Sequence, residues 1–502
     1  PYSGGDGYII GQDQFKIQWL NSSRYIKVTA KNGTSEVITG RNTRGVWIHV
    51  AATYSSSNSR LRLYINGQEF GSGVAVSGAL PPDASLFTVG KNPSSAGGHF
   101  HGNIDEVRVF NKALSADEIQ KMVYQEVENN AGVLHGSTIP RNITDYINPT
   151  TIVDLPWASM VRYYRMDTYK GNVIDDLKTP TVDEGTGLKL YNSKNIKIQT
   201  APLPFVTTQG GALNTAINDA VNGVRGTDAT NFDWSIVHVK HDNVTYNSHQ
   251  KHLGLIVDEL EGLNPINFTV GNNSELNVSW YLKLDGIIKL IGESQLVQGD
   301  DSELDIASKG QLEKNQQGTA DMFTYNYWSS PVSVASLTSN NNSYRVRDVM
   351  KDGASPITWL TSGYNGTNTN PIGIADYWIW TYTYQSGSSA WQHVRSTGYI
   401  KAGEGYTMKG PGTGSISTPQ EYLFKGKPNN GDIDLTLTAG NDYLVGNPYP
   451  SALDGKQFIL DNGPIIDGNG GTTGTLYFWE HWGGGSHILA EYQGGYATYN
   501  LS

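Results

Sequence analysis

The early part of the chain shows a regular alternation of apolar and polar positions. The alternation is clearest at residues 46–53 (VWIHVAAT) and 61–65 (LRLYI). Successive side chains of an extended chain point to opposite faces, so both stretches are expected to form half-buried β-strands. Asn66 and Gly67 follow the second stretch, and because both tolerate positive φ they predict a two-residue hairpin turn.

Residues 102–124 (GNIDEVRVFNKALSADEIQKMVY) predict a strand followed by a short helix. Ser115 and Glu118 have the spacing of a capping box, and apolar residues follow at helical intervals. In the preceding strand, the alternation places Asp105 on the same face as two valines. A carboxylate in such surroundings must be paired, hydrogen-bonded or bound to a cation.

Further along the chain, the same alternation returns at residues 276–282, and Gly and Asp recur every ~8–10 residues, which is typical of stacked short strands. The last third is richer in aromatic residues. Its apolar and glycine-marked stretches predict the hairpins of a β-sandwich, at 377–384, 398–410, 424–437 and 443–458. The pattern therefore predicts an all-β chain.

Composition narrows the class of protein. The 502 residues include 58 Gly and 29 Tyr but no Cys, and the net charge is −11. Without cysteine there is no disulfide, thiolate metal site or catalytic thiol, and the negative charge argues against nucleic acid as a partner. No apolar run reaches about 18 residues, so no membrane span is expected. Both ends are expected to be internal to a longer polypeptide.

The pattern WIHVAATYS…RLRLYINGQEFGSG…FTVGKNP…GNIDEVRVFNKALSADEI resembles the closing half of a laminin-G-like, concanavalin A-like jelly roll. This family includes lectins and glucanases, and it is a binding fold first and an enzyme only occasionally. The resemblance covers about a quarter of the chain. The opening strands of the family are not recognisable before residue 7 or so, and are expected to be missing.

The segments GESQLVQ, QQGTADMFTYNYWSSPV, IKAGEGYTMKG and YLVGNPYPSALD resemble a module of large secreted surface proteins of Bacteroidetes. The module often lies upstream of a type IX secretion sorting domain, and some relatives are adhesins of gliding flavobacteria. The resemblance implies export by that system to the cell surface. It implies no catalytic residues.

The expected organisation is a laminin-G-like jelly roll followed by further β-sandwich modules. Its parts are a jelly roll at 1–125, a linker with a partial β module at 126–204, a β module at 205–320, and an aromatic-rich β-sandwich at 321–502 that is truncated at its C-terminus.

The family resemblance implies a structural calcium ion with Asp105 as a ligand, helped by Asn103 and backbone carbonyls, because oxygen donors on a loop rim suit a hard cation. The alternative is a carboxylate that accepts backbone N–H bonds and fixes the corner between strand and helix. No other cofactor is expected.

Other candidate metal sites are weaker. His99 and His101 would share a strand face, whereas His238, His241, His249 and His252 have a spacing that does not converge on a strand. The acidic run Asp300, Asp301, Glu303 and Asp305 lacks the spacing of an EF-hand, so a solvated turn is the default interpretation.

Catalysis is not expected. The nearest match to the ExDxxE strand of the concanavalin-fold glucanases begins at Glu303 and Asp305 but has Ser308 in place of the third acid. No GxSxG, HExxH or P-loop motif occurs in a suitable context.

An aromatic row offers a different chemistry, because exposed rings stack on pyranose sugars in many binding modules. On one strand, Trp378, Trp380, Tyr382 and Tyr384 would share a face. The competing interpretation, which we favour at this point, is that the row fills the sandwich core. Trp328, Trp479 and Trp482 receive the same interpretation.

Together these features predict a fragment of a large secreted bacterial surface protein, located outside the cell, that acts in adhesion or ligand binding. The expected partner is an extracellular glycan or matrix polymer, with the type IX machinery engaged during export. Two alternatives stay open: a structural stalk without a ligand, and the accessory region of a polysaccharide-degrading enzyme.

Overall fold

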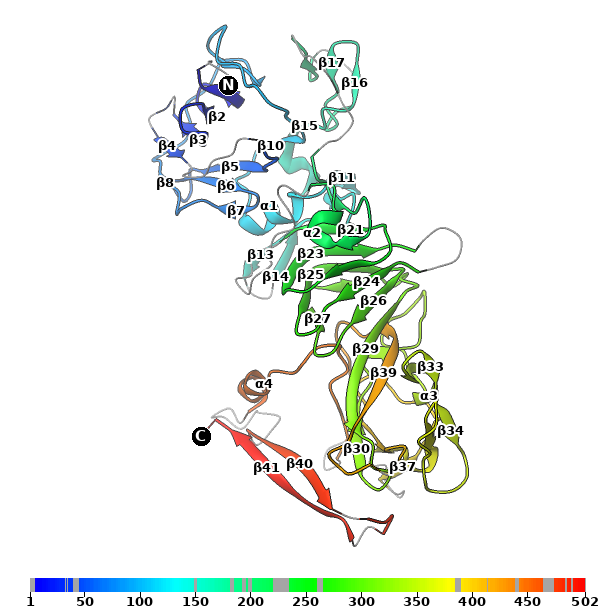
Figure 1. Ribbon diagram of the computed structural model, residues 1–502. Coiled ribbons are helices and arrows are strands. Elements are labelled where there is room, and N and C mark those ends of the chain that lie inside the picture. Colours follow the sequence, from blue (N-terminus) through cyan, green and yellow to red (C-terminus); the bar gives the residue numbers. More distant parts are fainter. Residues whose placement is uncertain are drawn as a thin grey trace. The chain divides into compact units, whose positions relative to one another are not determined.

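The computed structural model describes residues 5–31, 33, 35–38, 45–148, 151–180, 185–191, 196, 201–219, 234–259, 265–383, 390–412, 414–437, 442–463, 474–483, 485–488 and 491–501 (Figure 1). The chain forms two compact units. Unit 1 comprises Pro1–Val206, Ile217–Arg225 and Phe232–Val237, and unit 2 comprises Thr207–Ala216, Gly226–Asn231 and His238–Ser502. Strands dominate both units, which confirms the all-β class.

Unit 1 contains a jelly roll built from two antiparallel sheets. The first sheet has the order β4-β3-β2-β1-β9, with β1 (Gly7–Gln12), β2 (Phe15–Leu20), β3 (Tyr25–Ala30), β4 (Ser35–Ile38) and β9 (Thr88–Val89). The second sheet pairs β6 with β5, β7 and β8, whose bounds are β5 (Val50–Ser55), β6 (Arg60–Ile65), β7 (Gln68–Glu69) and β8 (Val74–Ala75). Residues 7–38 thus supply most of the first sheet.

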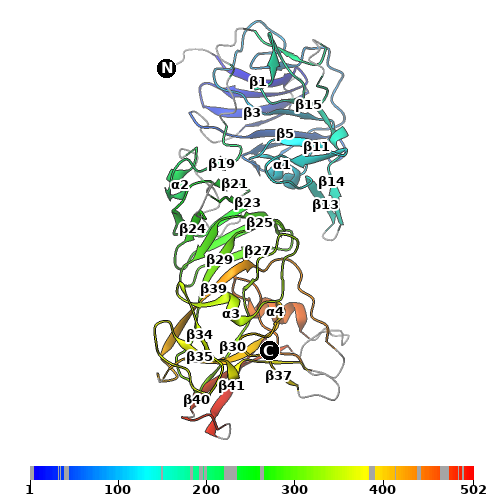
Figure 2. The ribbon, with the colours of Figure 1, turned by 90° about the vertical axis from the view of Figure 1, so that its right-hand side faces the viewer.

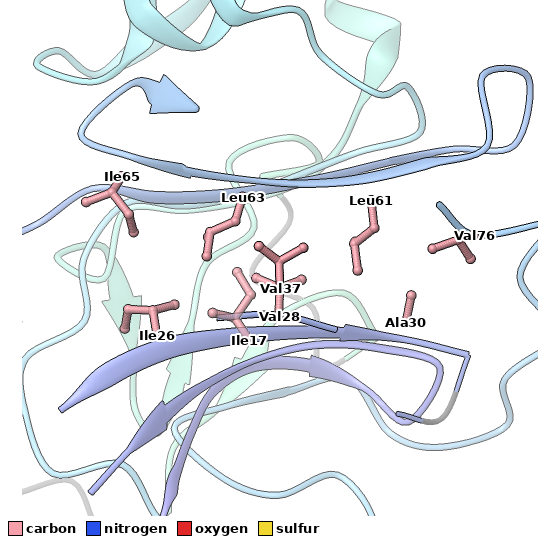
Figure 3. Close-up of a cluster of buried hydrophobic side chains, with 9 residues drawn as sticks. All are labelled: Ile17, Ile26, Val28, Ala30, Val37, Leu61, Leu63, Ile65 and Val76. Carbon is pink, nitrogen blue, oxygen red and sulfur yellow. The ribbon is translucent and has the colours of Figure 1, made fainter. Parts of the chain in front are cut away.

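The alternation seen in the sequence places the core of unit 1 between these sheets. Leu61 and Leu63 of β6 are fully buried and face Ile26 and Val28 of β3 (Figure 3). Asn66 and Gly67 form the predicted turn between β6 and β7, with φ of 50° and 83°. The strand before this hairpin begins only at Val50, so residues 46–49 of the predicted strand lie outside it.

The rest of unit 1 consists of the predicted helix and small antiparallel pairs. Helix α1 (Ala116–Met122) carries the predicted capping box, in which Ser115 and Glu118 bond each other's backbone N–H. The other elements are β10 (Val107–Phe110) with β15 (Met160–Tyr164), β11 (Val127–Asn130) with β12 (Val133–Gly136), β13 (Thr144–Asn148) with β14 (Thr151–Asp154), the β16-β17-β18 set (Tyr169–Lys170, Val173–Ile174, Leu188–Lys189), β19 (Phe205–Val206) and the 3-10 helix η1 (Trp157–Ser159).

Unit 2 begins with strands that stack in parallel (Figure 2). Most of these strands pair in parallel with the strand two places further along the chain, which is the connectivity of a β-solenoid. One sheet holds β20 (Gly211–Ala212), β22 (Val244–Tyr246), β24 (Asn267–Val270), β26 (Ile287–Leu290) and β29 (Gln311–Thr319); the other holds β23 (Gln250–Val257), β25 (Glu275–Leu284), β27 (Gln295–Gln298) and β28 (Glu303–Leu304). Strand β21 (Ile236–Val239) lies between β20 and β22 along the chain.

The solenoid explains the stacked-strand pattern of residues 205–320. Apolar residues at equivalent positions of successive coils are in register, as in the column Val244, Phe268, Ile288 and Leu312, and all four are fully buried. Alternation along a strand specifies which side chains face inward, but it does not distinguish parallel stacking from antiparallel hairpins.

The remainder of unit 2 is antiparallel. The long strand β39 (Pro419–Pro428) returns beside β29 and also pairs with β31 (Val332–Ser333) and β32 (Met350–Asp352). Two short helices are α2 (Leu213–Ala216) and α3 (Val346–Val349), and the remaining elements are β33 (Ser355–Pro356), β34 (Thr358–Leu360), β35 (Gly373–Ala375), α4 (Gly455–Asn462), β40 (Thr475–Gly483) and β41 (Gln493–Asn500). None of the helices that the structure describes combines the length and apolarity needed to cross a membrane.

A buried polar network ties the last coil of the solenoid to the antiparallel part. The ammonium of Lys427, on β39, donates to the carbonyls of Ile306 and Ser336 at 2.8 Å each. The side-chain amide of Asn429 donates to Ser330 and Pro448 carbonyls at 3.0 and 2.9 Å. Buried donors held in this way restrict how the connected segments can move.

Glycine at position 310 is required by the close approach of two coils, because a Cβ there would lie 2.1 Å from the Gly286 carbonyl oxygen. We predict that Gly310→Ala lowers the free energy of unfolding by about 2 kcal/mol, since the backbone must shift to relieve the overlap. Urea unfolding measures the loss. The control is Gly299→Ala, whose new methyl group meets no heavy atom within 4 Å. Equal midpoints for the two variants would contradict the close packing.

Candidate functional site

Asp105 does not lie on the strand face predicted for it. Strand β10 begins at Val107, and Glu106 before it has a left-handed backbone with φ of 52°, which breaks the alternation. Asp105 is half-buried and accepts the Glu106 backbone N–H at 3.1 Å, while Asn103 is exposed. The carboxylate therefore makes a backbone bond at the corner where the strand begins.

A buried charge cluster beside Asp105 escaped the sequence analysis. The side chains of Glu106 and Arg108 are each 8% exposed and form an ion pair of 2.5 Å. Tyr163 donates its hydroxyl to the same Glu106 oxygen at 2.9 Å, and Arg108 also donates to the carbonyls of Met122 and Gln125. Because both charges are buried, removing either partner would leave the other uncompensated. In the sequence, this cluster is indicated only by Glu106 and Arg108, two charged residues that alternate with valines in the predicted strand.

Burial and the neighbouring charge of Glu106 raise the pKa of Asp105 from 3.8 to about 6. A group of three or more His, Asp or Glu side chains placed to hold a metal ion is not found within the described ranges. The calcium ion at Asp105 and Asn103 therefore stays a prediction that rests on the family resemblance.

The other polar candidates of the sequence analysis are dispersed. His99 and His101 are both exposed. Of the four later histidines, His238 bonds Asp258 at 2.8 Å, and the others are separated: His241 bonds Thr207, His252 is buried against Gln250, and His249 is exposed. They do not converge, as their spacing predicted. In the acidic run, Asp305 accepts the Tyr281 hydroxyl at 2.5 Å, while Asp300 and Glu303 are exposed.

The aromatic row leads to a more substantial site, a four-stranded sheet with the order β30-β38-β36-β37. Its strands are β30 (Tyr325–Trp328), β36 (Trp380–Tyr382), β37 (Trp391–His393) and β38 (Tyr406–Lys409). Residues directly opposite each other on neighbouring strands share a face. The register therefore places eight side chains on one face, which we call the aromatic face: Tyr325, Tyr327, Trp380, Tyr382, Trp391, His393, Thr407 and Lys409.

The opposite face of this sheet is the one that packs into the core. Tyr406 and Met408 point there and are fully buried. Trp328 lies on the same side and contacts Tyr422 and Phe424 of β39, with ring centroids 5.4 and 5.8 Å away. The core interpretation is thus confirmed for Trp328. It is wrong for Trp380 and Tyr382, which are half-buried on the aromatic face.

The aromatic face is open to solvent along part of its length. Tyr327 is 54% exposed and Trp391, on the edge strand β37, is 40% exposed. Cross-strand pairs order the rings: Trp380 stacks on His393 at 4.1 Å with planes 10° apart. Tyr382 and Trp391 meet edge to face at 4.9 Å. Such contacts hold the rings in fixed orientations before any ligand arrives.

Trp378 departs from the predicted row. It belongs to the 3-10 helix η2 (Asp376–Trp378) rather than to the strand, and it is buried. Tyr384 and the side chains of Trp479 and Trp482 lie outside the described residues. The partner rings on β37 were missed by the sequence analysis, because their pairing with β36 depends on a register that no local pattern reveals.

Two further rings extend the cluster of rings on the aromatic face. Tyr377 contacts His393 at 5.0 Å and Trp380 at 6.0 Å, and Tyr364 contacts Tyr377 at 4.8 Å. Below them, the buried carboxylate of Asp376 accepts from Arg395 at 3.1 Å and from Ser396 at 3.0 Å. Burial, followed by the charge of Arg395, lowers the pKa of His393, so this ring is neutral at pH 7.

The raised pKa of Asp105 can be tested by substitution. Its pKa is raised in the folded state, so its contribution to stability is fully present below pH 3.8 and is lost as pH rises through about 6. We predict that Asp105→Asn raises the free energy of unfolding at pH 7.5 by about 1 kcal/mol, allowing for partial exposure, and leaves it unchanged at pH 4. Urea unfolding in chelated buffer measures this, with exposed Glu128→Gln as the control.

A variant less stable than the wild type at pH 7.5 in chelated buffer would contradict this electrostatic account. Added Ca²⁺ tests the family-derived expectation in the same experiment. An ion bound at Asp105 would stabilise the wild type and leave Asp105→Asn unaffected, because binding to the native state alone shifts the unfolding equilibrium.

Comparison with known proteins agrees with the jelly roll of unit 1. Residues 2–120 match the family model of the concanavalin A-like lectin/glucanases superfamily. No curated protein matches the chain.

Two solved structures share limited similarity. One is a candidate carbohydrate-binding protein from Bacteroides ovatus, with 19% identity and a TM-score of 0.25 over 35% of this chain and 46% of that chain. The other is an S-layer domain-containing protein from Clostridium thermocellum, with 28% identity and a TM-score of 0.15 over 24% of this chain and 65% of that one. The chain therefore spans less than two thirds of either, and TM-scores this low support no inference about the fold.

A second family model covers the chain from the beginning of the solenoid onward. It matches residues 211–502, which is more than half of the 502-residue chain. The chain therefore belongs to the family described as a domain of unknown function, DUF8693.

Proposed function

We propose that this chain is a carbohydrate-binding part of an extracellular bacterial surface protein, and that the aromatic face of unit 2 is its glycan site. The observation that carries the proposal is the placement of the rings. They lie on the face of the sheet opposite the core, where Trp391 and Tyr327 stay substantially exposed. An exposed apolar face of this kind marks a binding surface.

The chemistry of the face favours neutral polysaccharide. Rings in fixed orientations offer apolar surfaces to the C–H faces of pyranoses. Besides the tyrosines, its titratable side chains are His393, which is neutral at pH 7, and Lys409, which is buried. No described position on the face carries an exposed charge that could pair with a carboxylate or sulfate. The net charge of −11 also disfavours polyanions.

The jelly roll supports the same class of function, because the superfamily it matches contains lectins. The loops at one rim of this jelly roll are a separate glycan-binding surface in this proposal. Adhesion to a glycan or matrix polymer, export by the type IX system, and binding without catalysis form part of this proposal and rest on the sequence resemblances.

A stalk is the second candidate, and the solenoid favours it. Successive coils of a solenoid build a rigid support from local contacts, and such a support needs no ligand. The two functions predict different results in a binding measurement, because a stalk binds none of the oligosaccharides that a lectin would bind.

The test is calorimetric titration with cellohexaose, xylohexaose and mannohexaose, and with an oligogalacturonate as the anionic comparison. We predict binding to at least one neutral ligand, little change between 50 and 500 mM salt, and none to the oligogalacturonate. Trp391→Ala should weaken binding at least tenfold, on the order of 1.4 kcal/mol. The control is Tyr399→Ala, which removes a ring that is more exposed than Trp391 (69% against 40%) and is not on the aromatic face.

An affinity that Trp391→Ala leaves unchanged would move the site away from the aromatic face. Binding that favours the oligogalacturonate and weakens with salt would contradict the neutral ligand class. No binding to any of the four oligosaccharides would favour the stalk.

A further inference from the structure

A buried lysine lies within the aromatic face. Lys409 is 2% exposed, although it belongs to a face whose other end is open to solvent. Its ammonium nitrogen lies 3.8 Å from the ring centroid of Trp378, 4.4 Å from that of Tyr325 and 4.9 Å from that of Tyr492. We call these three rings and the ammonium the Lys409 box.

Polar partners complete the box. The ammonium donates to the Tyr492 hydroxyl, and His487 Nδ1 lies 3.3 Å from it. Among the described residues no carboxylate lies within 4.0 Å of the ammonium, although the charge of Asp321 acts on it from further away. A desolvated cation without a direct counter-ion is stabilised chiefly by the ring faces around it.

The box is joined to the exposed rings through Trp378. The indole N–H of Trp378 donates to the Tyr364 carbonyl at 2.7 Å, and its ring meets Tyr377 edge to face at 4.9 Å. Tyr377 in turn contacts both members of the stacked pair Trp380 and His393. The Thr407 hydroxyl of β38 donates to the Trp378 carbonyl at 2.9 Å, which fixes the backbone of η2 over the same strand that carries Lys409.

We propose that Lys409 is a positioning residue of the glycan site: its ammonium, held in the ring box, fixes Trp378 and thereby aligns Tyr377 and the Trp380–His393 pair for stacking on sugar. This inference rests on the proposed function of the aromatic face. It goes beyond that function because it assigns the alignment of the site to a cation that the glycan never touches. Replacing the ammonium by an apolar group of similar length removes the cation–π attraction to Trp378 and leaves its ring held by the remaining contacts.

If Lys409 had a purely structural role, the glycan affinity of the folded protein would not depend on the charge of Lys409. Burial lowers the pKa of this ammonium to about 8, against the opposing effect of Asp321. The other titratable groups facing it are His487, whose pKa is lowered, and Tyr325 and Tyr492, whose pKa values are raised by burial. Between pH 7 and pH 9.5, Lys409 is therefore the member of this group that changes charge.

The experiment compares wild type, Lys409→Met and Lys409→Arg, with exposed Lys401→Met as the matched control. Each is titrated with the neutral hexasaccharide that the wild type binds best, and near-UV circular dichroism reports the ring geometry without ligand. Lys409→Met is expected to lose at least tenfold in affinity and to change the aromatic signal. Lys409→Arg keeps the cation and is expected to stay within threefold of wild type, and Lys401→Met to match it.

The wild-type affinity is expected to fall as pH rises through about 8, and the affinity of Lys409→Met to stay constant over the same range. If Lys409→Met does not fold, the pH profile of the wild type remains decisive.

A Lys409→Met affinity within twofold of wild type, or a wild-type profile flat from pH 7 to 9.5, would overturn the positioning role while leaving the glycan site intact. Failure of the wild type to bind any hexasaccharide would instead overturn the proposed function. An aromatic signal that Lys409→Met leaves unchanged would then count against the positioning role as well.

Discussion

A β-sheet has two faces, and the sheet β30-β38-β36-β37 packs one of them into the core while the other stays partly open to solvent. Trp328, Tyr406 and Met408 occupy the packed face, whereas Tyr327 and Trp391 on the other face stay exposed. Burial of those rings would stabilise the fold by roughly 25 cal/mol for each Å² of apolar surface removed from water. The exposed rings do not make this contribution. Stability alone gives no reason for an exposed row of rings ordered by stacking. A ligand that covers the face does.

In both units, buried charged side chains contact defined partners. In unit 1, Arg108 is balanced by Glu106 and further held by two backbone carbonyls. In unit 2, Lys409 has ring faces in place of a carboxylate, and Lys427 donates to two backbone carbonyls. Buried ions contribute little net stability but are strongly destabilising when a partner is lost. Such groups therefore specify one arrangement of the segments around them, which a preorganised binding surface requires.

Local patterns predicted several of the local elements. The capping box of α1, the Asn66-Gly67 turn and the inward face of β25 all follow from rules that act within a few residues. The sequence did not show that the strands of residues 211–319 stack in parallel, because both arrangements bury the same alternate side chains. For a related reason, the sequence indicated only part of the aromatic face. Trp380 and Tyr382 are neighbours in sequence, but their partners on β37 join them only through the sheet, and the sequence cannot show which face the core covers.

Hydroxyl-radical footprinting, with and without a saturating neutral oligosaccharide, tests the account most directly, because it reports each ring's protection without changing any residue. The account predicts that Trp391, Tyr382 and Tyr327 become protected together while Tyr399 does not. Protection confined to the rim loops of the jelly roll, or spread evenly over exposed aromatic residues, would contradict it.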